Sequence, residues 1–251
     1  MTKIVICGAN GKMGKQVYEC VCNRKDCKIV AGIDLNTEKY ADFPIYRDIS
    51  ELPEKPDVII DYSHVSSLTS LLMYCMTTGT PVVLATTGYS EEQIAGIKKA
   101  ATQVPVFFSW NMSLGINLLV QLAKKATTIL GDQFDIEIIE KHHNQKIDAP
   151  SGTALMIANA INETKNNGMK YTYDRHSRRQ KREPNEIGIH AVRGGTIVGV
   201  HEVLFAGNDE TITISHSAAS KNVFAEGSVN AAVFIKDLKA GLYDMGSIID
   251  Q

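Results

Sequence analysis

A glycine-rich turn near the start of the chain constrains the fold most. Residues 3–7 form a short apolar run, the turn at residues 8–14 follows it, and apolar residues then recur at helical spacing. A second apolar run at residues 28–33 ends at Asp34. Strand, glycine turn, helix, strand and acid together make the dinucleotide-binding layout, in which a pyrophosphate lies on the helix N-terminus. The cofactor contacts predicted in this turn are Gly8, Asn10, Gly11, Lys12, Met13 and Gly14.

Asp34 indicates which dinucleotide is used. It follows Gly14 by 20 positions, close to the spacing expected for an acid that bonds the adenosine ribose. A carboxylate accepts hydrogen bonds from a ribose 2′-hydroxyl but repels a 2′-phosphate. No arginine follows Asp34 directly, and the nearest cation in the sequence is Lys39. We therefore expect NADH to be accepted at least as well as NADPH.

The alternation of strands and helices continues to residue 108. Apolar runs at residues 57–61, 81–85 and 105–108 are separated by segments with helical periodicity. Near-continuous apolar strands are typical of a parallel sheet covered on both faces, so we predict a Rossmann-like α/β domain. Ligands of such sheets bind at the carboxyl ends of the strands. At these ends lie Thr86, Thr87, Ser109, Trp110, Asn111 and Met112, although Trp110 could equally fill the core.

A dense run of ionisable residues occupies the middle of the chain. An alternating strand pattern at residues 134–139 precedes it, and a helical pattern follows Ser151, the expected N-cap. His142 and His143 are adjacent, and two imidazolium charges ~4 Å apart repel by about 4 kcal/mol at an effective dielectric of ~20. One histidine is therefore expected to be neutral near pH 7 and suited to general acid–base catalysis. Lys146 could add a proton or a fixed charge.

The helix start beside this run is a candidate anion site. Gly152 and Thr153 lie in the first turn, where unpaired backbone N–H groups bind carboxylates or phosphates. The run from residue 140 to residue 150 is predicted to be the loop between the strand and this helix.

The segment Glu140-x-His142-His143-x-x-Lys146-x-Asp148-Ala149-Pro150-Ser151-Gly152-Thr153-Ala154 resembles the signature of the dihydrodipicolinate reductase (4-hydroxy-tetrahydrodipicolinate reductase) family of lysine biosynthesis. The resemblance implies the NAD(P)H-dependent reduction of 4-hydroxy-tetrahydrodipicolinate, a cyclic dicarboxylate of the diaminopimelate pathway, to tetrahydrodipicolinate. It also implies a homotetramer. The resemblance implies that His142 is the general acid–base and that Lys146 is the second proton donor. It also implies that the substrate is bound by His143, Gly152 and Thr153.

Other stretches resemble the same family, with departures. The G-x-x-G-x-x-G spacing of the first turn is also found in the family. Residues 85–87 and 109–112 resemble its Gly-Thr-Thr and Asn-Phe-Ser cofactor contacts, with Ala85 in place of glycine and Met112 in place of phenylalanine. Residues 217–221 correspond to a stretch that usually ends in an arginine that binds a substrate carboxylate. Lys221 keeps the charge but lacks the bidentate fork.

Later strand patterns complete the predicted organisation. Runs at residues 187–193, 196–205 and 210–216, with Gly194 and Gly195 as a turn, indicate an antiparallel or mixed sheet. We predict a dinucleotide-binding domain from residues 1–112 and 222–251, and an α+β substrate-binding and oligomerisation domain from residues 113–221.

Composition limits the alternatives. The net charge of −2 and the absence of a long apolar run argue against nucleic-acid and membrane partners. Five cysteines without a CxxC pair suggest free thiols in the cytoplasm and no metal site. A basic run at residues 175–182 is expected to be a solvated loop. Two other functions remain: another reductase on this scaffold, such as an amino-acid dehydrogenase, and a dinucleotide-sensing regulator that uses the basic run on nucleic acid.

Overall fold

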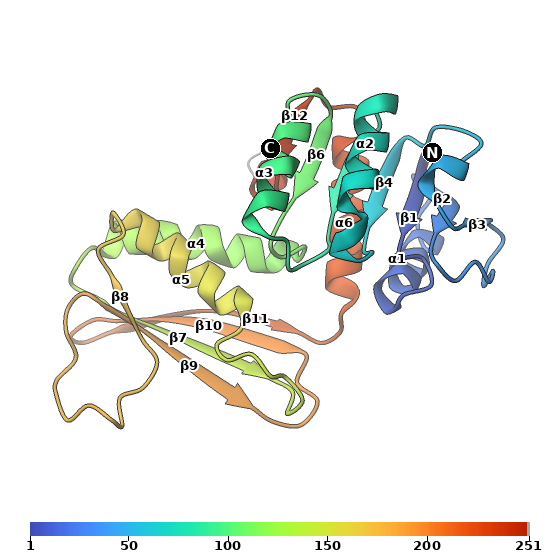
Figure 1. Cartoon of the computed structure of the whole chain (residues 1–251). Helices are drawn as coiled ribbons and strands as arrows, with labels where there is room; N and C mark the ends of the chain where they lie inside the picture. The colour runs from blue at the N-terminus through green and yellow to red at the C-terminus, as the bar shows by residue number, and fades with distance from the viewer. Residues whose placement is uncertain (250–251) are drawn as a thin grey trace. The chain divides into compact units, whose positions relative to one another are not determined.

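The computed structural model describes residues 1–249, which form two compact units (Figure 1). The first unit contains Met1–Leu114 and the chain from Lys221 onward, and the second is Gly115–Ser220. The sequence placed the first domain at 1–112 and 222–251, whose last two residues lie outside the described part. Each unit is built around its own sheet, so each is considered by itself below.

The first unit is a seven-stranded sheet in the order β12-β6-β5-β4-β1-β2-β3, and every strand pair is parallel. Its strands are β1 (Thr2–Cys7), β2 (Cys27–Ile33), β3 (Ile45–Tyr46), β4 (Val58–Asp61), β5 (Val82–Leu84), β6 (Pro105–Phe108) and β12 (Gly241–Tyr243). Its helices are α1 (Lys12–Cys22), α2 (Leu68–Thr78), α3 (Glu91–Ala100), α6 (Asn222–Ile235) and α7 (Met245–Ile249), with short 3₁₀ turns η1 (Ile49–Glu51) and η2 (Val65–Ser67).

Alternation along β1 divides the core of this unit between two faces. Ile4 and Ile6 pack with residues of α1 and α6, whereas Val5 and Cys7 pack with residues of α2 and α3. Helices on both faces exclude water from the backbone of the central strands, as a parallel sheet requires. The predicted Rossmann-like fold is therefore confirmed.

The second unit is a five-stranded mixed sheet in the order β11-β10-β7-β9-β8. Its strands are β7 (Asp135–His142), β8 (Lys170–Thr172), β9 (Glu186–Arg193), β10 (Gly199–Ala206) and β11 (Thr211–Ala218), and its helices are α4 (Leu114–Leu130) and α5 (Gly152–Thr164). The predicted mixed sheet is confirmed, although β9 and β10, which Gly194 and Gly195 connect, do not pair directly. β7 lies between them, parallel to β9 and antiparallel to β10.

Both helices of this unit lie on one side of its sheet (Figure 1). Ile136 and Ile138 of β7 pack there against Ile157 and Ile161 of α5. The opposite face carries half-buried side chains, including Ile139 and Leu204. Among residues 1–249, no helix is both long and apolar enough to cross a membrane.

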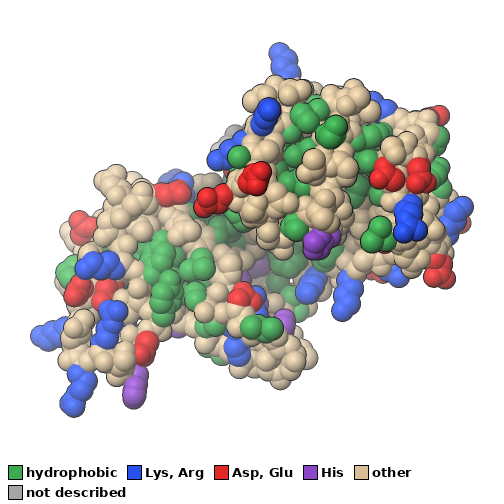
Figure 2. All heavy atoms as spheres, viewed as in Figure 1, with side chains coloured by type: hydrophobic (Ala, Val, Ile, Leu, Met, Phe, Trp, Pro, Cys, Tyr) green, Lys and Arg blue, Asp and Glu red, His purple; other side chains and the backbone are tan. Residues whose placement is uncertain are grey.

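The loop between β8 and β9 differs from the solvated loop expected for the basic run. Arg175 bonds Glu137 at 2.6 Å and Glu186 at 2.9 Å, and Arg182 bonds Asp135 at 2.7 Å. Blue and red side chains accordingly mix over this loop in Figure 2. Two of its arginines are thus tied to the sheet, because β7 and β9 place carboxylates beneath them.

Candidate active site

The first turn of the parallel sheet fits a dinucleotide pyrophosphate. Gly8 has a positive φ of 77°, and a Cβ on it would lie 2.5 Å from the carbonyl oxygen of Tyr62. A Cβ on Gly14 would lie 2.3 Å from the carbonyl oxygen of Gly8, so both positions require glycine. Gly11 caps α1 without a side-chain hydrogen bond. First-turn N–H groups of α1 are therefore available to an anion.

Asp34 lies directly after β2, and Asn10 supports it. The backbone N–H of Asn10 donates to Oδ2 of Asp34 at 2.9 Å, and that of Asn36 donates to Oδ1 at 3.1 Å. The side-chain amide of Asn10 donates to the carbonyls of Asn36 at 2.6 Å and Glu38 at 3.0 Å. In this structure Asn10 therefore fixes the loop after β2.

Two cavities lie along the carboxyl edge of the parallel sheet. One of about 660 Å³ is lined by Gly8, Gly11 and Asp34. The other, of about 570 Å³, brings together most of the remaining predicted contacts: Met13, Ala85, Thr86, Thr87, Ser109, Trp110, Asn111 and Met112. Lys221 also lines the second cavity, and Tyr62, Ser63 and His64 line both. Asn10, Lys12 and Gly14 line neither cavity.

The structure adds detail on two of the predicted cofactor contacts, Thr86 and Trp110. The Thr86 hydroxyl donates to the buried carboxylate of Asp61 at 3.0 Å and to the carbonyl of Ser63 at 3.0 Å. It therefore stabilises the end of β4 beside the cavity. Trp110 is 60% exposed, which excludes the core-filling alternative.

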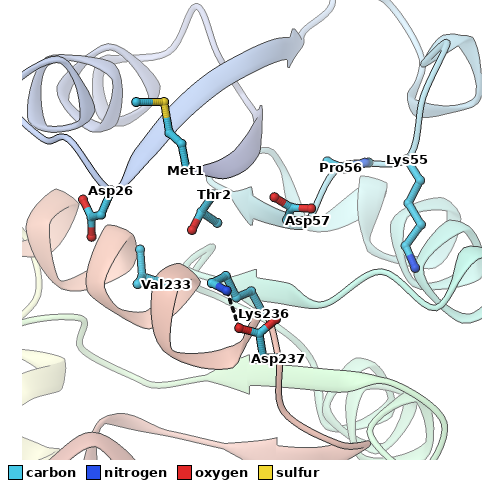
Figure 3. Close-up of a pocket in the computed structure, with 9 residues that line it drawn as sticks. All are labelled: Met1, Thr2, Asp26, Lys55, Pro56, Asp57, Val233, Lys236 and Asp237. Carbon is cyan, nitrogen blue, oxygen red and sulfur yellow. Dashed lines mark hydrogen bonds and ion pairs between the residues drawn. The ribbon is translucent and has the colours of Figure 1, made fainter.

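A third cavity, of about 540 Å³, lies at the amino ends of β1 and β4 (Figure 3). Thr2, Asp57 and Lys55 line it, and the ion pair between Lys236 and Asp237 closes one side. Because parallel sheets bind ligands at the carboxyl ends of their strands, this cavity does not belong to the dinucleotide site.

In the second unit, the segment Glu140–His142 is the end of strand β7 and not a loop, which corrects the sequence prediction. Glu140 is 0% exposed and His142 is 9% exposed. Nδ1 of His142 lies 2.6 Å from Oε2 of Glu140. Because Nδ1 donates to the carboxylate, Nε2 is the nitrogen that can exchange a proton with a ligand.

Arg193 keeps Glu140 ionised inside the protein. Its two terminal nitrogens donate to both carboxylate oxygens at 2.8 Å, and the backbone N–H of Ser151 donates to Oε1 at 2.9 Å. Burial alone would raise the pKa of Glu140, but the hydrogen bonds from Arg193, His142 and Ser151 lower it overall. A permanent negative charge therefore orients the ring of His142.

His201 of β10 completes the cluster. Its ring lies edge-on to that of His142 with centroids 5.2 Å apart, and its Nε2 lies 3.0 Å from the Ser151 hydroxyl. Burial, and to a smaller degree the charge of His142, lower the pKa of His201 to about 4. The ring is consequently neutral at pH 7 and accepts the Ser151 proton, while Ser151 Oγ caps α5 by accepting from the N–H of Ala154 at 3.2 Å.

The loop between β7 and α5 carries the other predicted residues. Lys146 pairs with Asp148 at 2.7 Å, and the Arg193 side chain donates to the carbonyl of Asp148 at 2.6 Å. A Cβ on Gly152 would meet nothing within 4 Å, so the space beside this helix start is open. A buried acid–histidine pair, a lysine and an open helix N-terminus can together bind an anionic substrate and move protons.

Comparison with known proteins identifies the family. Residues 2–112 match the family described as "Dihydrodipicolinate reductase, N-terminus", and residues 115–249 match "Dihydrodipicolinate reductase, C-terminus". The chain belongs to the dihydrodipicolinate reductase family. The predicted family and the predicted enzyme class, a reductase, are thereby confirmed.

Relatives of this family match over nearly the whole chain. The 4-hydroxy-tetrahydrodipicolinate reductase of Caldanaerobacter subterraneus subsp. tengcongensis is 50% identical over 99% of this chain and 98% of its own length. That of Clostridium tetani is 46% identical over 100% of this chain and 98% of its own. The dipicolinate-bound dihydrodipicolinate reductase of Paenisporosarcina sp. TG-14 has a TM-score of 0.82 and 26% identity, and the match covers 97% of each chain.

Sequence reasoning missed two members of the histidine cluster, Arg193 and His201, and gave Glu140 no role. Register explains their meeting, because His142 pairs with Arg193 and Glu140 pairs with His201 across the sheet. One signal was available. Glu140 continues the alternation of Ile136 and Ile138 along the strand, so the sequence alone places the Glu140 carboxylate on the buried face.

Proposed function

We propose that this chain is an NAD(P)H-dependent 4-hydroxy-tetrahydrodipicolinate reductase of the diaminopimelate route to lysine. The observation that carries the proposal is the buried Glu140 carboxylate bonded to Nδ1 of His142, within the signature of the family. This pair gives the reductase an oriented proton donor and acceptor at the position that the signature assigns to catalysis.

The first unit binds the cofactor in this proposal. Gly8, Gly11 and the start of α1 hold the pyrophosphate, and Asp34 bonds the adenosine ribose. The cavity lined by Met13, Thr87 and Asn111 takes the nicotinamide end. When bound, the nicotinamide supplies a hydride. NADH is accepted at least as well as NADPH, because Asp34 disfavours a 2′-phosphate.

The second unit holds the substrate and moves its protons. The reaction replaces the 4-hydroxyl group by hydrogen, so one hydride and one proton are consumed and one water is released. His142 acts as the general acid–base through Nε2, and Lys146 is the second proton donor. His143, Gly152 and Thr153 bind the substrate carboxylates, the last two at the N-terminus of α5.

The proposal also keeps the predicted cytoplasmic location, which the five free cysteines support. It makes the enzyme a homotetramer that assembles through the second unit. The support is the face of the β7–β11 sheet opposite α4 and α5, where Ile139 and Leu204 lack a covering helix within residues 1–249. The proposal includes no nucleic-acid partner, and the pairing of Arg175 and Arg182 with carboxylates supports that expectation.

The test is to mix the purified protein with enzymatically generated 4-hydroxy-tetrahydrodipicolinate and NADH and to follow the nicotinamide absorbance. Substrate-dependent oxidation of NADH is the expected result, and repeating the assay with NADPH measures the preference. If NADH binds but is not consumed, the substrate assignment is wrong. A preference for NADPH of about tenfold or more would contradict the role given to Asp34.

A further inference from the structure

A single arginine enters the ribose end of the predicted dinucleotide site from a neighbouring strand. Arg47 directly follows β3, and Asp34 directly follows β2. Ile33 of β2 pairs in parallel with Tyr46 of β3, and the N–H of Asp34 donates to the carbonyl of Tyr46 at 3.0 Å. Neighbouring strands lie about 4.8 Å apart, so the backbones of Asp34 and Arg47 are adjacent although the two residues are 13 positions apart in the sequence.

Both side chains line the cavity that contains Gly8 and Gly11. Arg47 is the only lysine or arginine among its lining residues, all of which lie within the described chain. Lys39, the nearest cation to Asp34 in the sequence, does not line it. No arginine directly follows Asp34 in the sequence, but Arg47, at the end of the neighbouring strand β3, places a positive charge in the same cavity.

The guanidinium of Arg47 is available to a ligand. Within residues 1–249 it makes no hydrogen bond or ion pair, and the residue is exposed. Neither carboxylate of the same cavity pairs with Arg47: Asp34 accepts from two backbone N–H groups, and Asp48 accepts from the N–H and hydroxyl of Ser50 at 2.9 and 2.6 Å.

Arg47 offsets the negative charge of the two carboxylates that line this cavity, Asp34 and Asp48. Two carboxylates line the cavity, so without Arg47 they would strongly disfavour another anion there. NADH and NADPH differ in the 2′-phosphate of the adenosine ribose, and an arginine near the ribose acid accommodates that phosphate in Rossmann-type sites. A guanidinium also matches phosphate geometry with two parallel hydrogen bonds.

We propose that Arg47 binds the 2′-phosphate of NADPH beside Asp34. The inference rests on the dinucleotide site of the proposed function and refines it. Asp34 serves the 2′-hydroxyl of NADH, and Arg47 offsets the repulsion that would otherwise exclude NADPH.

The test compares two fragments that differ only in the 2′-phosphate, 2′,5′-ADP and 5′-AMP, by calorimetry on the full-length protein. Arg47→Gln is expected to weaken 2′,5′-ADP binding about tenfold, equivalent to about 1.4 kcal/mol, and to leave 5′-AMP unchanged. Arg47→Lys keeps the charge without the fork, so it should retain part of the discrimination. Raising the salt concentration should weaken 2′,5′-ADP binding to the wild type more than to Arg47→Gln.

Two controls make the outcome specific. Lys98→Gln removes one positive charge from the exposed surface of α3 and should change neither affinity. Lys39→Gln tests the rival cation. Equal effects of Arg47→Gln on both fragments, or a selective effect of Lys39→Gln instead, would overturn the role of Arg47 while the reductase assignment stands. If neither fragment binds the wild type, the cofactor site itself is wrong and this proposal falls with it.

Discussion

Glu140 shows how one residue can serve both stability and catalysis. Its carboxylate is fully buried, and it remains charged because Arg193, His142 and the N–H of Ser151 all donate to it. Removing one partner from such a cluster leaves an uncompensated buried charge, which typically costs about 3–5 kcal/mol. The position therefore cannot be changed without an effect on both the fold and the orientation of His142.

Glu140→Gln tests this dual role at the scale of one residue. The neutral amide leaves Arg193 without its anion and His142 without its orienting charge. We expect turnover to fall by about 10²-fold or more, and the free energy of unfolding to fall by about 3 kcal/mol. NADH affinity should not change. Initial rates and urea unfolding measure both effects.

Asp132→Asn is the matched control, because the Asp132 carboxylate pairs with Lys165 at an exposed site of the same unit. It should alter neither turnover nor stability by a comparable amount. Normal turnover in Glu140→Gln would show that His142 does not need the carboxylate.

Residues close in sequence were predictable, whereas their distant partners were not. The Gly8–Gly14 turn, Asp34 and the Ser151 cap follow from local patterns. Arg193 and His201 meet Glu140 from 53 and 61 positions away, and strand pairing places the backbone of Arg47 beside that of Asp34. Such contacts depend on strand order and register, which a single sequence does not encode locally.

At the scale of elements, the second sheet shows the same limit. Apolar alternation located β9, β10 and β11 to within a few residues, and β10 and β11 pair as an antiparallel hairpin. Gly194 and Gly195 connect β9 to β10, yet these two strands do not pair, because β7 occupies the position between them. That insertion buries Ile136 and Ile138 at the centre of the sheet, where their packing outweighs the local turn signal.

The loop tied to this sheet gives a prediction about pH. The hydrogen bond from Arg175 lowers the pKa of Glu186, whose side chain is 4% exposed. The unfolded carboxyl titrates near ~4.3, so the pair contributes stability above that pH and loses it as the pH falls through the lower folded value. We therefore expect the free energy of unfolding to decrease below about pH 4.3.

Arg175→Gln should flatten this acid dependence, since Glu186 then loses the partner that lowers its pKa. Urea unfolding of the wild type and the variant between about pH 6 and 3 measures the difference. Arg179→Gln, which removes a charge from the exposed part of the same loop, should keep the wild-type slope. Identical slopes for the wild type and Arg175→Gln would show that the pair does not contribute.

At the scale of the whole molecule, the face of the second sheet that no helix covers within residues 1–249 predicts assembly. Leu204 lies in the middle of β10 on this face, opposite Glu137 and Thr213. Light scattering after size exclusion should give about four times the 27.5 kDa of one chain. Leu204→Lys should shift the protein to smaller species, because a lysine charge would be buried in the contact.

Ile129→Lys is the matched control for assembly, because Ile129 is 71% exposed near the end of α4 and away from this face. It should leave the mass unchanged. A wild type that elutes as a monomer would contradict the proposed tetramer. The assignment of the chain as a reductase would still stand.

The most direct test of the central claim is the turnover of His142→Ala measured beside its affinity for NADH. If His142 is the proton-transferring group oriented by Glu140, turnover should fall by about 10²–10⁴-fold while the dissociation constant of NADH stays within about twofold. His176→Ala, at an exposed position of the β8–β9 loop, should match the wild type in both measurements. Unchanged turnover in His142→Ala would contradict the account, because the pair that carries the proposed function would then take no part in the reaction.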